Sequence, residues 1–221
     1  MIVRLVTFLA AVSIAGAAGT ALAQAPAANP VAVTSLDGSP LLRRMVQLNS
    51  KVKTYRAVVH LDVALKTFPY ISPSLEGNVY YKQPDKEAVV FDTVPALASQ
   101  FKKVYPRVDP PASWLRIYDV AQMGDDGALT TFRLVPKKNG RVEHLDVKVD
   151  DATATIKSYI WTYKEGGFVS FDQTFETLDG NYLVEKQSGH VDLPSYKAEV
   201  TSAFSKYQLN VQIADSVFEE K

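Results

Sequence analysis

The fold class is decided by one stretch of the sequence, Tyr55-Arg-Ala-Val-Val-His-Leu-Asp-Val-Ala-Leu-Lys66. Its odd-numbered positions hold only tyrosine, alanine, valine and leucine, whereas its even-numbered positions include arginine, histidine, aspartate and lysine. An apolar–polar alternation with a period of two is typical of a β-strand with one buried face. We therefore predict a long strand at 55–66, in a sheet whose opposite face meets water.

The alternation returns along the chain in segments that turn-forming residues separate. Such turns occur at Gly124-Asp-Asp-Gly127, Lys138-Asn-Gly140, Glu165-Gly-Gly167 and Asp179-Gly-Asn181, and strands joined by turns this short are antiparallel. The further predicted strands are 75–83, 87–94, 114–121, 129–135, 142–149, 155–164, 168–178, 182–188 and 196–211. Because a sheet this large twists strongly, we predict a mainly β protein: a large curved antiparallel sheet that forms an incomplete β-barrel, lidded by short helices.

Two short helices are expected to interrupt the strands. Ser39 is a good N-cap and Pro40 suits the first helical position, and the apolar residues that follow lie on one stripe at helical spacing. A second helix is predicted at 95–105, where Leu97 and Phe101 share a helical face. This second helix is either a cover over the apolar side of the sheet or an ordinary plug in the core.

The N-terminus has the parts of a secretory signal peptide, predicted at 1–23. Arg4 supplies the positive charge, the stretch after it is apolar and uncharged, and a small-x-small cleavage pattern ends at Ala23. A membrane-spanning helix is the alternative, but glycine, serine and threonine dilute the apolar stretch and no basic cluster follows it. Residues 24–38, rich in alanine and proline, are predicted to be a flexible leader, and 39–221 a single domain. The location is therefore predicted to be periplasmic or otherwise extracytoplasmic.

Composition excludes several classes of function. The chain has 24 basic and 24 acidic residues, and removal of residues 1–23 takes away one arginine, which leaves a net charge of −1. This balance argues against a nucleic-acid partner, because binding phosphates needs a basic face. The sequence has no cysteine, which excludes disulfides, thiol catalysis and cysteine-ligated zinc.

No sequence motif for catalysis or for a cofactor is found. The chain lacks a Gly-x-Ser-x-Gly elbow, a glycine-rich phosphate loop and a His-Glu-x-x-His pair. The three histidines, His60, His144 and His190, are scattered. The alternation puts His60 and His144 on polar faces, so we expect them to face solvent. A metal site or a hydrolase base remains open as the alternative, since two histidines on strands can meet across a sheet.

Two pairs of adjacent carboxylates, Asp125/Asp126 and Asp150/Asp151, fall at predicted turns. Aspartates at such positions mostly form turns by hydrogen-bonding to the backbone. A calcium site is the alternative there. A glycosidase-type pair of carboxylates contributed by distant strands also stays open, although no residue marks it.

Aromatic and aliphatic side chains throughout the β region carry the functional prediction. A curved sheet that leaves an apolar hollow would bind an apolar ligand, although core packing is the alternative for any single residue. A register error of one residue would move a whole strand's set to the other face. The residues that we predict as wall or lid of the hollow are Val59, Leu61, Val63, Val79, Tyr81, Val89, Phe91, Leu97, Phe101, Phe171 and Phe204.

Several segments resemble the periplasmic carriers of outer-membrane lipoproteins, the LolA/LolB type, whose fold is shared with the sensor-binding protein RseB. The resemblance covers 41–218 and is carried by the amphipathic helix with the long strand after it, and by 75–86 (LEGNVYYKQPDK), 133–138 (RLVPKK), 145–156 and 207–218. It implies an unclosed β-barrel lidded by helices, a cavity for acyl chains, and neither a cofactor nor enzymatic activity. The arginine-bearing strand of these carriers corresponds to 87–92, which has no arginine, so no arginine role is carried over.

The leading hypothesis is a non-enzymatic, exported carrier that holds lipid or the acyl chains of lipoproteins, with transient membrane contact and a monomeric state. The second hypothesis is an RseB-like regulatory or scaffold module that binds a protein partner in the cell envelope. The third is a β-rich hydrolase of the envelope, which requires a pocket holding His60 or His144 with a carboxylate in reach.

Overall fold

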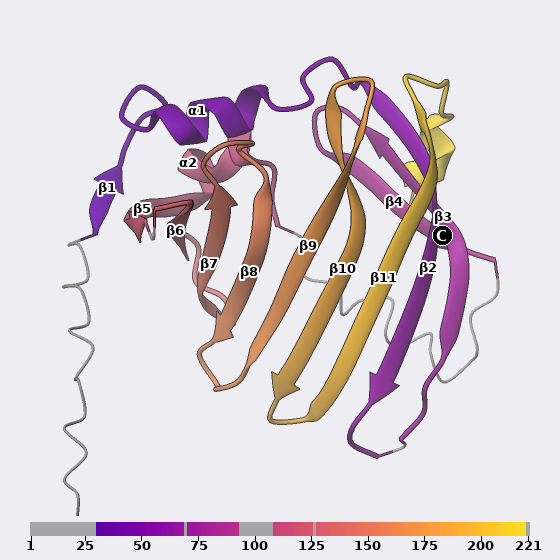
Figure 1. Ribbon diagram of the computed structural model, residues 1–221. Helices are drawn as coiled ribbons and strands as arrows, with labels where there is room; N and C mark the ends of the chain where they lie inside the picture. Colours follow the sequence, from indigo (N-terminus) through magenta and orange to yellow (C-terminus); the bar gives the residue numbers. More distant parts are fainter. Residues whose placement is uncertain (1–29, 69, 93–107, 126, 220–221) are drawn as a thin grey trace, which may run out of the picture.

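The computed structural model describes residues 30–68, 70–92, 108–125 and 127–219. These residues form one antiparallel sheet of eleven strands in the order β1-β5-β6-β7-β8-β9-β10-β11-β2-β3-β4 (Figure 1). The strands are β1 (Val31–Val33), β2 (Thr54–Leu65), β3 (Ser74–Lys82), β4 (Lys86–Phe91), β5 (Tyr118–Asp125), β6 (Leu129–Pro136), β7 (Val142–Asp150), β8 (Ile156–Tyr163), β9 (Phe168–Leu178), β10 (Asn181–Leu193) and β11 (Tyr196–Leu209). The end strands β1 and β4 do not pair with each other, so the sheet does not close into a barrel.

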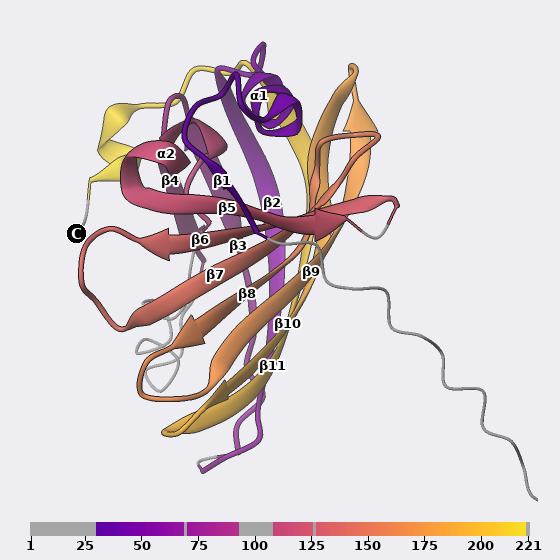
Figure 2. The ribbon, with the colours of Figure 1, turned by 90° about the vertical axis from the view of Figure 1, so that its left-hand side faces the viewer.

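The sheet is strongly curved. Figure 2 shows the strand direction turning step by step from β3 to β5, which bends the sheet around a concave side. Such bending follows from the right-handed twist that each strand adds to its neighbour. The prediction of a mainly β protein with a large, curved, open antiparallel sheet is confirmed.

Helix α1 (Pro40–Gln47) lies across one end of the curved sheet (Figure 1). Ser39 is its N-cap and accepts a hydrogen bond from the backbone N of Leu42 at 3.3 Å, with Pro40 in the first turn. Leu42 and Met45 are buried in the same core cluster as the sheet residues. The first predicted helix is therefore confirmed with its capping signals.

The predicted strand 114–121 is wrong in its first half. A short 3₁₀ helix η2 (Pro111–Ser113) runs directly into α2 (Trp114–Ile117), and β5 begins only at Tyr118. The indole Nε1 of Trp114 donates to the backbone O of Asp109 at 2.7 Å, and its ring packs edge-on against Phe132 with the centroids 6.0 Å apart. Because this arrangement buries Trp114 completely, tertiary packing overrides the strand-like alternation of the sequence.

The predicted leader 24–38 is corrected for the part that the structure describes. Residues 31–33 form β1, which pairs with β5 so that Val33 lies opposite Val120. Val33 is buried, whereas Val31 is exposed. This strand covers the edge of β5, whose backbone groups would otherwise lack partners. The predicted signal peptide 1–23 and the predicted helix 95–105 lie outside the described residues.

Two further elements complete the description. The predicted strand 182–188 extends as β10 to Leu193, and a second 3₁₀ helix, η3 (Asp215–Phe218), lies near β4. Within the described part of the chain, no helix has the length and apolarity needed to cross a membrane.

Candidate functional site: the inner face of the sheet

The predicted wall residues lie on one face of the sheet. Residues directly opposite each other on neighbouring strands point to the same side, and the register pairs Val79 with Ala57 and Val89, and Phe171 with Gly189 and Tyr159. Following these pairs from β4 to β9 puts every described member on the face that packs against α1 and α2, which we call the inner face. These members are Val59, Leu61, Val63, Val79, Tyr81, Val89, Phe91, Phe171 and Phe204. Leu97 and Phe101 lie outside the described residues.

The residues of the inner face become less buried toward the end strand β4. Val59, Leu61, Val63, Val79 and Phe171 are buried, whereas Tyr81, Phe91 and Phe204 are half-buried. Val89, on the end strand β4, is 46% exposed. The inner face is therefore a packed core beneath the helices and becomes accessible to solvent along β4.

Strands β8 and β9 add inner-face residues that were not predicted as wall residues, notably Tyr159, Trp161 and Val169. Tyr159 stacks on Phe171 with the ring centroids 5.4 Å apart. The alternation in this segment is blurred because Ile160, which is 40% exposed, points to the outer face. Alternate positions of a strand share a face, so the spacing from Trp161 back to Tyr159 was the signal that could have identified these residues.

A second aromatic group lies where β2, β3 and β11 meet. Tyr55 stacks on Tyr81 at 5.1 Å between ring centroids and meets the edge of Tyr207 at 5.5 Å. The hydroxyl of Tyr207 donates to the backbone O of Val184 at 2.7 Å. Burial raises the pKa of Tyr207, and Glu176 adds to this effect, so the phenol stays neutral at physiological pH. This group extends the inner face as an aromatic surface, with Glu87 opposite Tyr81 on the same face.

Polar groups on the inner face are few and mostly paired. Gln187 donates to the side-chain oxygen of Gln173 at 3.2 Å, and Gln173 donates to the backbone O of Ile156 at 3.2 Å. Trp161 differs, because its indole Nε1 is buried and has no hydrogen-bond partner among the described residues. The inner face thus combines a predominantly apolar surface with one unsatisfied donor.

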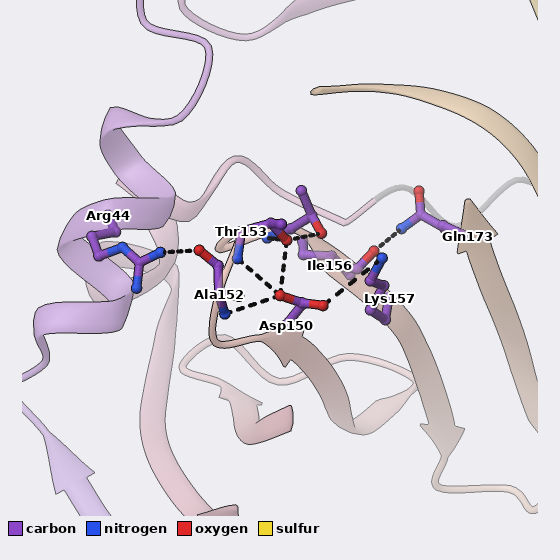
Figure 3. Close-up of polar contacts among 8 residues, drawn as sticks. Arg44, Asp150, Ala152, Thr153, Ile156, Lys157 and Gln173 are labelled. Carbon is purple, nitrogen blue, oxygen red and sulfur yellow. Dashed lines mark hydrogen bonds and ion pairs between the residues drawn. The ribbon is translucent and has the colours of Figure 1, made fainter. Parts of the chain in front are cut away.

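The turn between β7 and β8 anchors α1 (Figure 3). Arg44 donates to the backbone oxygens of Asp151 at 2.8 Å and Ala152 at 2.6 Å. Asp150 accepts hydrogen bonds from the backbone N of Ala152 at 3.0 Å and of Thr153 at 2.8 Å. The hydrogen bond from Thr153 is the largest cause of the lowered pKa of Asp150. This turn fixes the helix that covers one end of the inner face.

The same turn decides the role of the carboxylate pair Asp150/Asp151. Asp150 forms a turn by hydrogen-bonding to the backbone, as predicted, and Lys157 lies 4.0 Å from it. With Lys157 beside the carboxylate, calcium would meet a like charge there. No group of three or more histidine, aspartate or glutamate side chains that could hold a metal ion is found in the described part of the chain. In the pair Asp125/Asp126, Asp126 lies outside the described residues.

His60 sits in a polar cluster on the outer face of β2 and β3. Its Nδ1 lies 2.5 Å from Glu76, and its Nε2 lies 3.1 Å from Asp62 and 3.3 Å from the hydroxyl of Ser74. The hydrogen bond with Glu76 is the main cause of the raised pKa of His60. The prediction that His60 faces solvent on a polar face is confirmed.

This cluster superficially has the order serine–histidine–carboxylate of a hydrolase. However, the Ser74 hydroxyl donates to Asp62 at 2.7 Å, and carboxylates flank both nitrogens of the His60 ring. A ring that donates at both nitrogens cannot accept the proton of serine. The cluster also lies on the open outer face, with the side chain of His60 41% exposed. Its geometry favours an ion-pair cluster between two strands.

His144 is less exposed than predicted. Its side chain, on β7, is 18% exposed and lies 3.7 Å from Asp146, which also pairs with Arg133. Strands β8 to β11 separate β7 from β2 in the sheet, so His144 and His60 do not meet. A shallow pocket of about 310 Å³ lies elsewhere, and its mixed, charged lining does not suit an acyl chain; it consists of Asp85, Asp109, Pro110, Ser113, Arg116 and Ile117.

Comparison with known proteins shows the fold. No family model and none of the curated proteins match this sequence. Among solved structures, a DUF1329 family protein from Desulfovibrio piger superposes with a TM-score of 0.64 at 15% identity, covering 81% of this chain and 95% of that one. A LolA superfamily protein from Nitrosomonas europaea gives 0.61 at 12% identity, covering 85% and 98%.

A third structure is described as an outer membrane lipoprotein-sorting protein domain from Vibrio parahaemolyticus. It superposes with a TM-score of 0.58 at 11% identity and covers 80% of this chain and 95% of that one. The chain therefore has the half-barrel fold seen in the LolA superfamily, as the sequence resemblance implied. At these identities the likeness is one of fold.

Proposed function

We propose that this protein is an exported, non-enzymatic carrier that binds lipid or the acyl chains of lipoproteins on the inner face of its half-barrel. The observation that carries the proposal is the continuous, predominantly apolar inner face from β4 to β9, on which nine predicted wall residues coincide. Each CH₂ group that leaves water for such a surface contributes about 0.8 kcal/mol. The shared fold with a lipoprotein-sorting domain supports the same conclusion.

The proposed location rests on the N-terminal sequence. Residues 1–23 have the pattern of a cleavable signal peptide that ends at Ala23. We therefore place the mature carrier outside the cytoplasm, where lipids and lipoproteins pass between membranes. The described part of the chain holds an apolar face and no candidate metal cluster, and the proposal involves neither a metal nor a cofactor.

The first test is native mass spectrometry of the protein purified from its own cell envelope. A carrier is expected to retain a bound mass that organic extraction removes. Absence of that mass, together with a stable complex with an envelope protein, would contradict the carrier proposal. That outcome would favour the RseB-like regulatory module instead.

The two exposed valines of β4 provide a matched pair for the second test. Val89 lies on the inner face opposite Val79, and Val90 lies on the outer face opposite Asn78. Their exposed fractions are 46% and 47%, so a glutamate at either position stays in contact with water. We expect Val89→Glu to weaken binding of a fluorescent acyl probe about tenfold or more, because a charge on the inner face must lose water when the ligand binds.

The control variant, Val90→Glu, is expected to bind the acyl probe as the unsubstituted protein does. Both proteins should give the same far-ultraviolet circular dichroism spectrum and similar midpoints of urea unfolding. Equal weakening by the two substitutions, or by neither, would contradict binding on the inner face.

Membrane contact is proposed at the loop between β2 and β3. Phe68 is 86% exposed and Tyr70 is 70% exposed. The base of this loop is held by the backbone hydrogen bond from Leu65 N to Ile71 O at 3.0 Å. Exposed aromatic rings suit the interface between lipid headgroups and acyl chains. The loop therefore offers a means of transient contact during loading or release.

We expect the double substitution Phe68→Ser and Tyr70→Ser to reduce co-sedimentation with phosphatidylglycerol vesicles about three- to tenfold, while acyl-probe binding in solution is retained. The control is Val135→Ser, which removes an apolar side chain that is 41% exposed on the outer face of β6. Co-sedimentation that is unchanged in the double variant would remove this loop from the proposal.

A further inference from the structure

Within residues 30–68, 70–92, 108–125 and 127–219, the indole of Trp161 is a buried donor of the inner face that has no hydrogen-bond partner. Trp161 lies on β8 directly opposite Leu145 and Val169, both of which are buried. The residue is 6% exposed, and no acceptor in the described part of the chain meets its buried Nε1. An unpaired buried donor costs about 1–3 kcal/mol and is rare in folded proteins.

The chain contains two tryptophans, and the other is fully satisfied. Trp114 is completely buried, and its Nε1 donates to the backbone O of Asp109 at 2.7 Å. Both rings belong to the same core cluster. Packing of an indole in this core is thus compatible with a hydrogen bond, and the lack of one at Trp161 is specific to that position.

The surroundings of Trp161 limit what could accept its hydrogen bond. The described inner-face residues beside it include Leu145, Val169 and Tyr159, and none of these three carries a charge. A carboxylate or phosphate placed there would be desolvated with one donor to stabilise it, which is strongly unfavourable. A neutral carbonyl oxygen on an apolar chain loses much less hydration free energy than a charged group when it leaves water, and one donor satisfies its need for a hydrogen bond.

We propose that Trp161 Nε1 donates a hydrogen bond to the acyl carbonyl of the bound ligand, and that the site therefore selects esters or amides of fatty acids over plain hydrocarbon or alkyl-ether chains. This inference rests on the proposed carrier function, whose ligand it narrows by chemical class. Trp161 acts as a specificity-determining residue in a site where apolar contacts supply most of the affinity.

The test compares two lipids that differ in the carbonyl alone. Mature protein with ¹⁵N-labelled tryptophan gives two indole N–H resonances, which Trp161→Phe and Trp114→Phe assign. The probes are dioctanoyl phosphatidylglycerol and its dialkyl-ether analogue with the same chains and headgroup. We expect the ester lipid to move the Trp161 indole proton downfield and the ether lipid to leave it nearly unchanged, while the Trp114 resonance stays in place with both.

Affinity gives a second measurement. The unsubstituted protein is expected to bind the ester about two- to tenfold more tightly than the ether, which is the range of one net hydrogen bond. Trp161→Phe should bind both lipids equally, and Trp114→Phe should keep the preference. The ester–ether comparison on the unsubstituted protein decides the matter even if a variant is too unstable to measure.

The outcomes separate the two proposals. If both lipids bind equally and the Trp161 resonance responds identically to both, or to neither, the carbonyl inference is overturned and the carrier function stands. The same result is expected if a buried water molecule satisfies the indole. If neither lipid binds, the proposed function fails and the inference fails with it.

Discussion

Replacing Gly189 with valine is expected to lower the free energy of unfolding by about 3 kcal/mol. Gly189 lies in β10 between Phe171 of β9 and Val200 of β11. A Cβ atom at position 189 would lie 2.3 Å from Cε1 and 2.7 Å from Cδ1 of the Phe171 ring. That ring is buried and stacked on Tyr159, so moving it away from position 189 would disturb this packing.

The measurement is urea unfolding followed by circular dichroism. Gly189→Ala should destabilise in the same direction by a smaller amount, because it introduces the Cβ without the two methyl groups. The matched control is Gly140→Ala, at a turn where a Cβ would meet nothing within 4 Å, and it should change stability by less than about 0.5 kcal/mol. If Gly189→Val is as stable as Gly140→Ala, the placement of Phe171 over the glycine is wrong.

The contact between Gly189 and Phe171 also bears on the proposed site. Because Gly189 has no side chain, the Phe171 ring lies over β10 at this position. Loss of this packing is expected to weaken acyl binding as well as stability, because Phe171 is one of the proposed wall residues.

The strand 55–66 shows what the sequence alone can predict. Its observed bounds, Thr54–Leu65, differ from the predicted ones by one residue at each end. The assignment of faces was right because a shift of one residue would have put Arg56, His60 and Asp62 into the core. The same reasoning placed the nine described wall residues on one face. Where a strand alternates clearly between apolar and polar residues, only one assignment of its two faces buries the apolar side chains.

The incorrect predictions arose where tertiary contacts decide the local structure. The local pattern around Trp114 suits a strand, but the bond from its indole to Asp109 and its packing on Phe132 favour a helical turn. Similarly, Val31 and Val33 stand in an alanine- and proline-rich segment, yet they pair with β5, a strand that lies far along the chain. Phe132 lies 18 residues after Trp114, and β5 lies far beyond Val33, so neither is visible in the local sequence.

The donor at Trp161 illustrates the same limit for the site. Trp161 is not among the predicted wall residues, although it lies on the inner face. Whether its Nε1 finds an acceptor depends on the neighbours that β7 and β9 bring to it. The hydrogen bonding of inner-face side chains can therefore be predicted only when the register of the whole sheet is known.

The second large effect is expected at α1, where Leu42→Ala should lower the free energy of unfolding by about 2–5 kcal/mol. Leu42 is completely buried in the core cluster. The helix is only eight residues long, and a helix this short is unstable unless it packs against the rest of the protein. Leu41→Ala is the matched control, because Leu41 is half-buried on the same helix. This substitution should lower the free energy of unfolding clearly less than Leu42→Ala.

Hydrogen exchange distinguishes a fixed cover from a moving lid. The amide of Leu48 donates to the backbone O of Arg44 at 2.9 Å. If α1 is a permanent cover, this amide exchanges slowly in the unsubstituted protein and faster in Leu42→Ala. Fast exchange in both proteins, together with an equal loss of unfolding free energy in Leu41→Ala and Leu42→Ala, would instead show that α1 opens. With α1 fixed by Leu42 and Arg44, the proposed ligand would have to reach the inner face elsewhere, and Val89 is an exposed wall residue on β4 at which Val89→Glu tests that route.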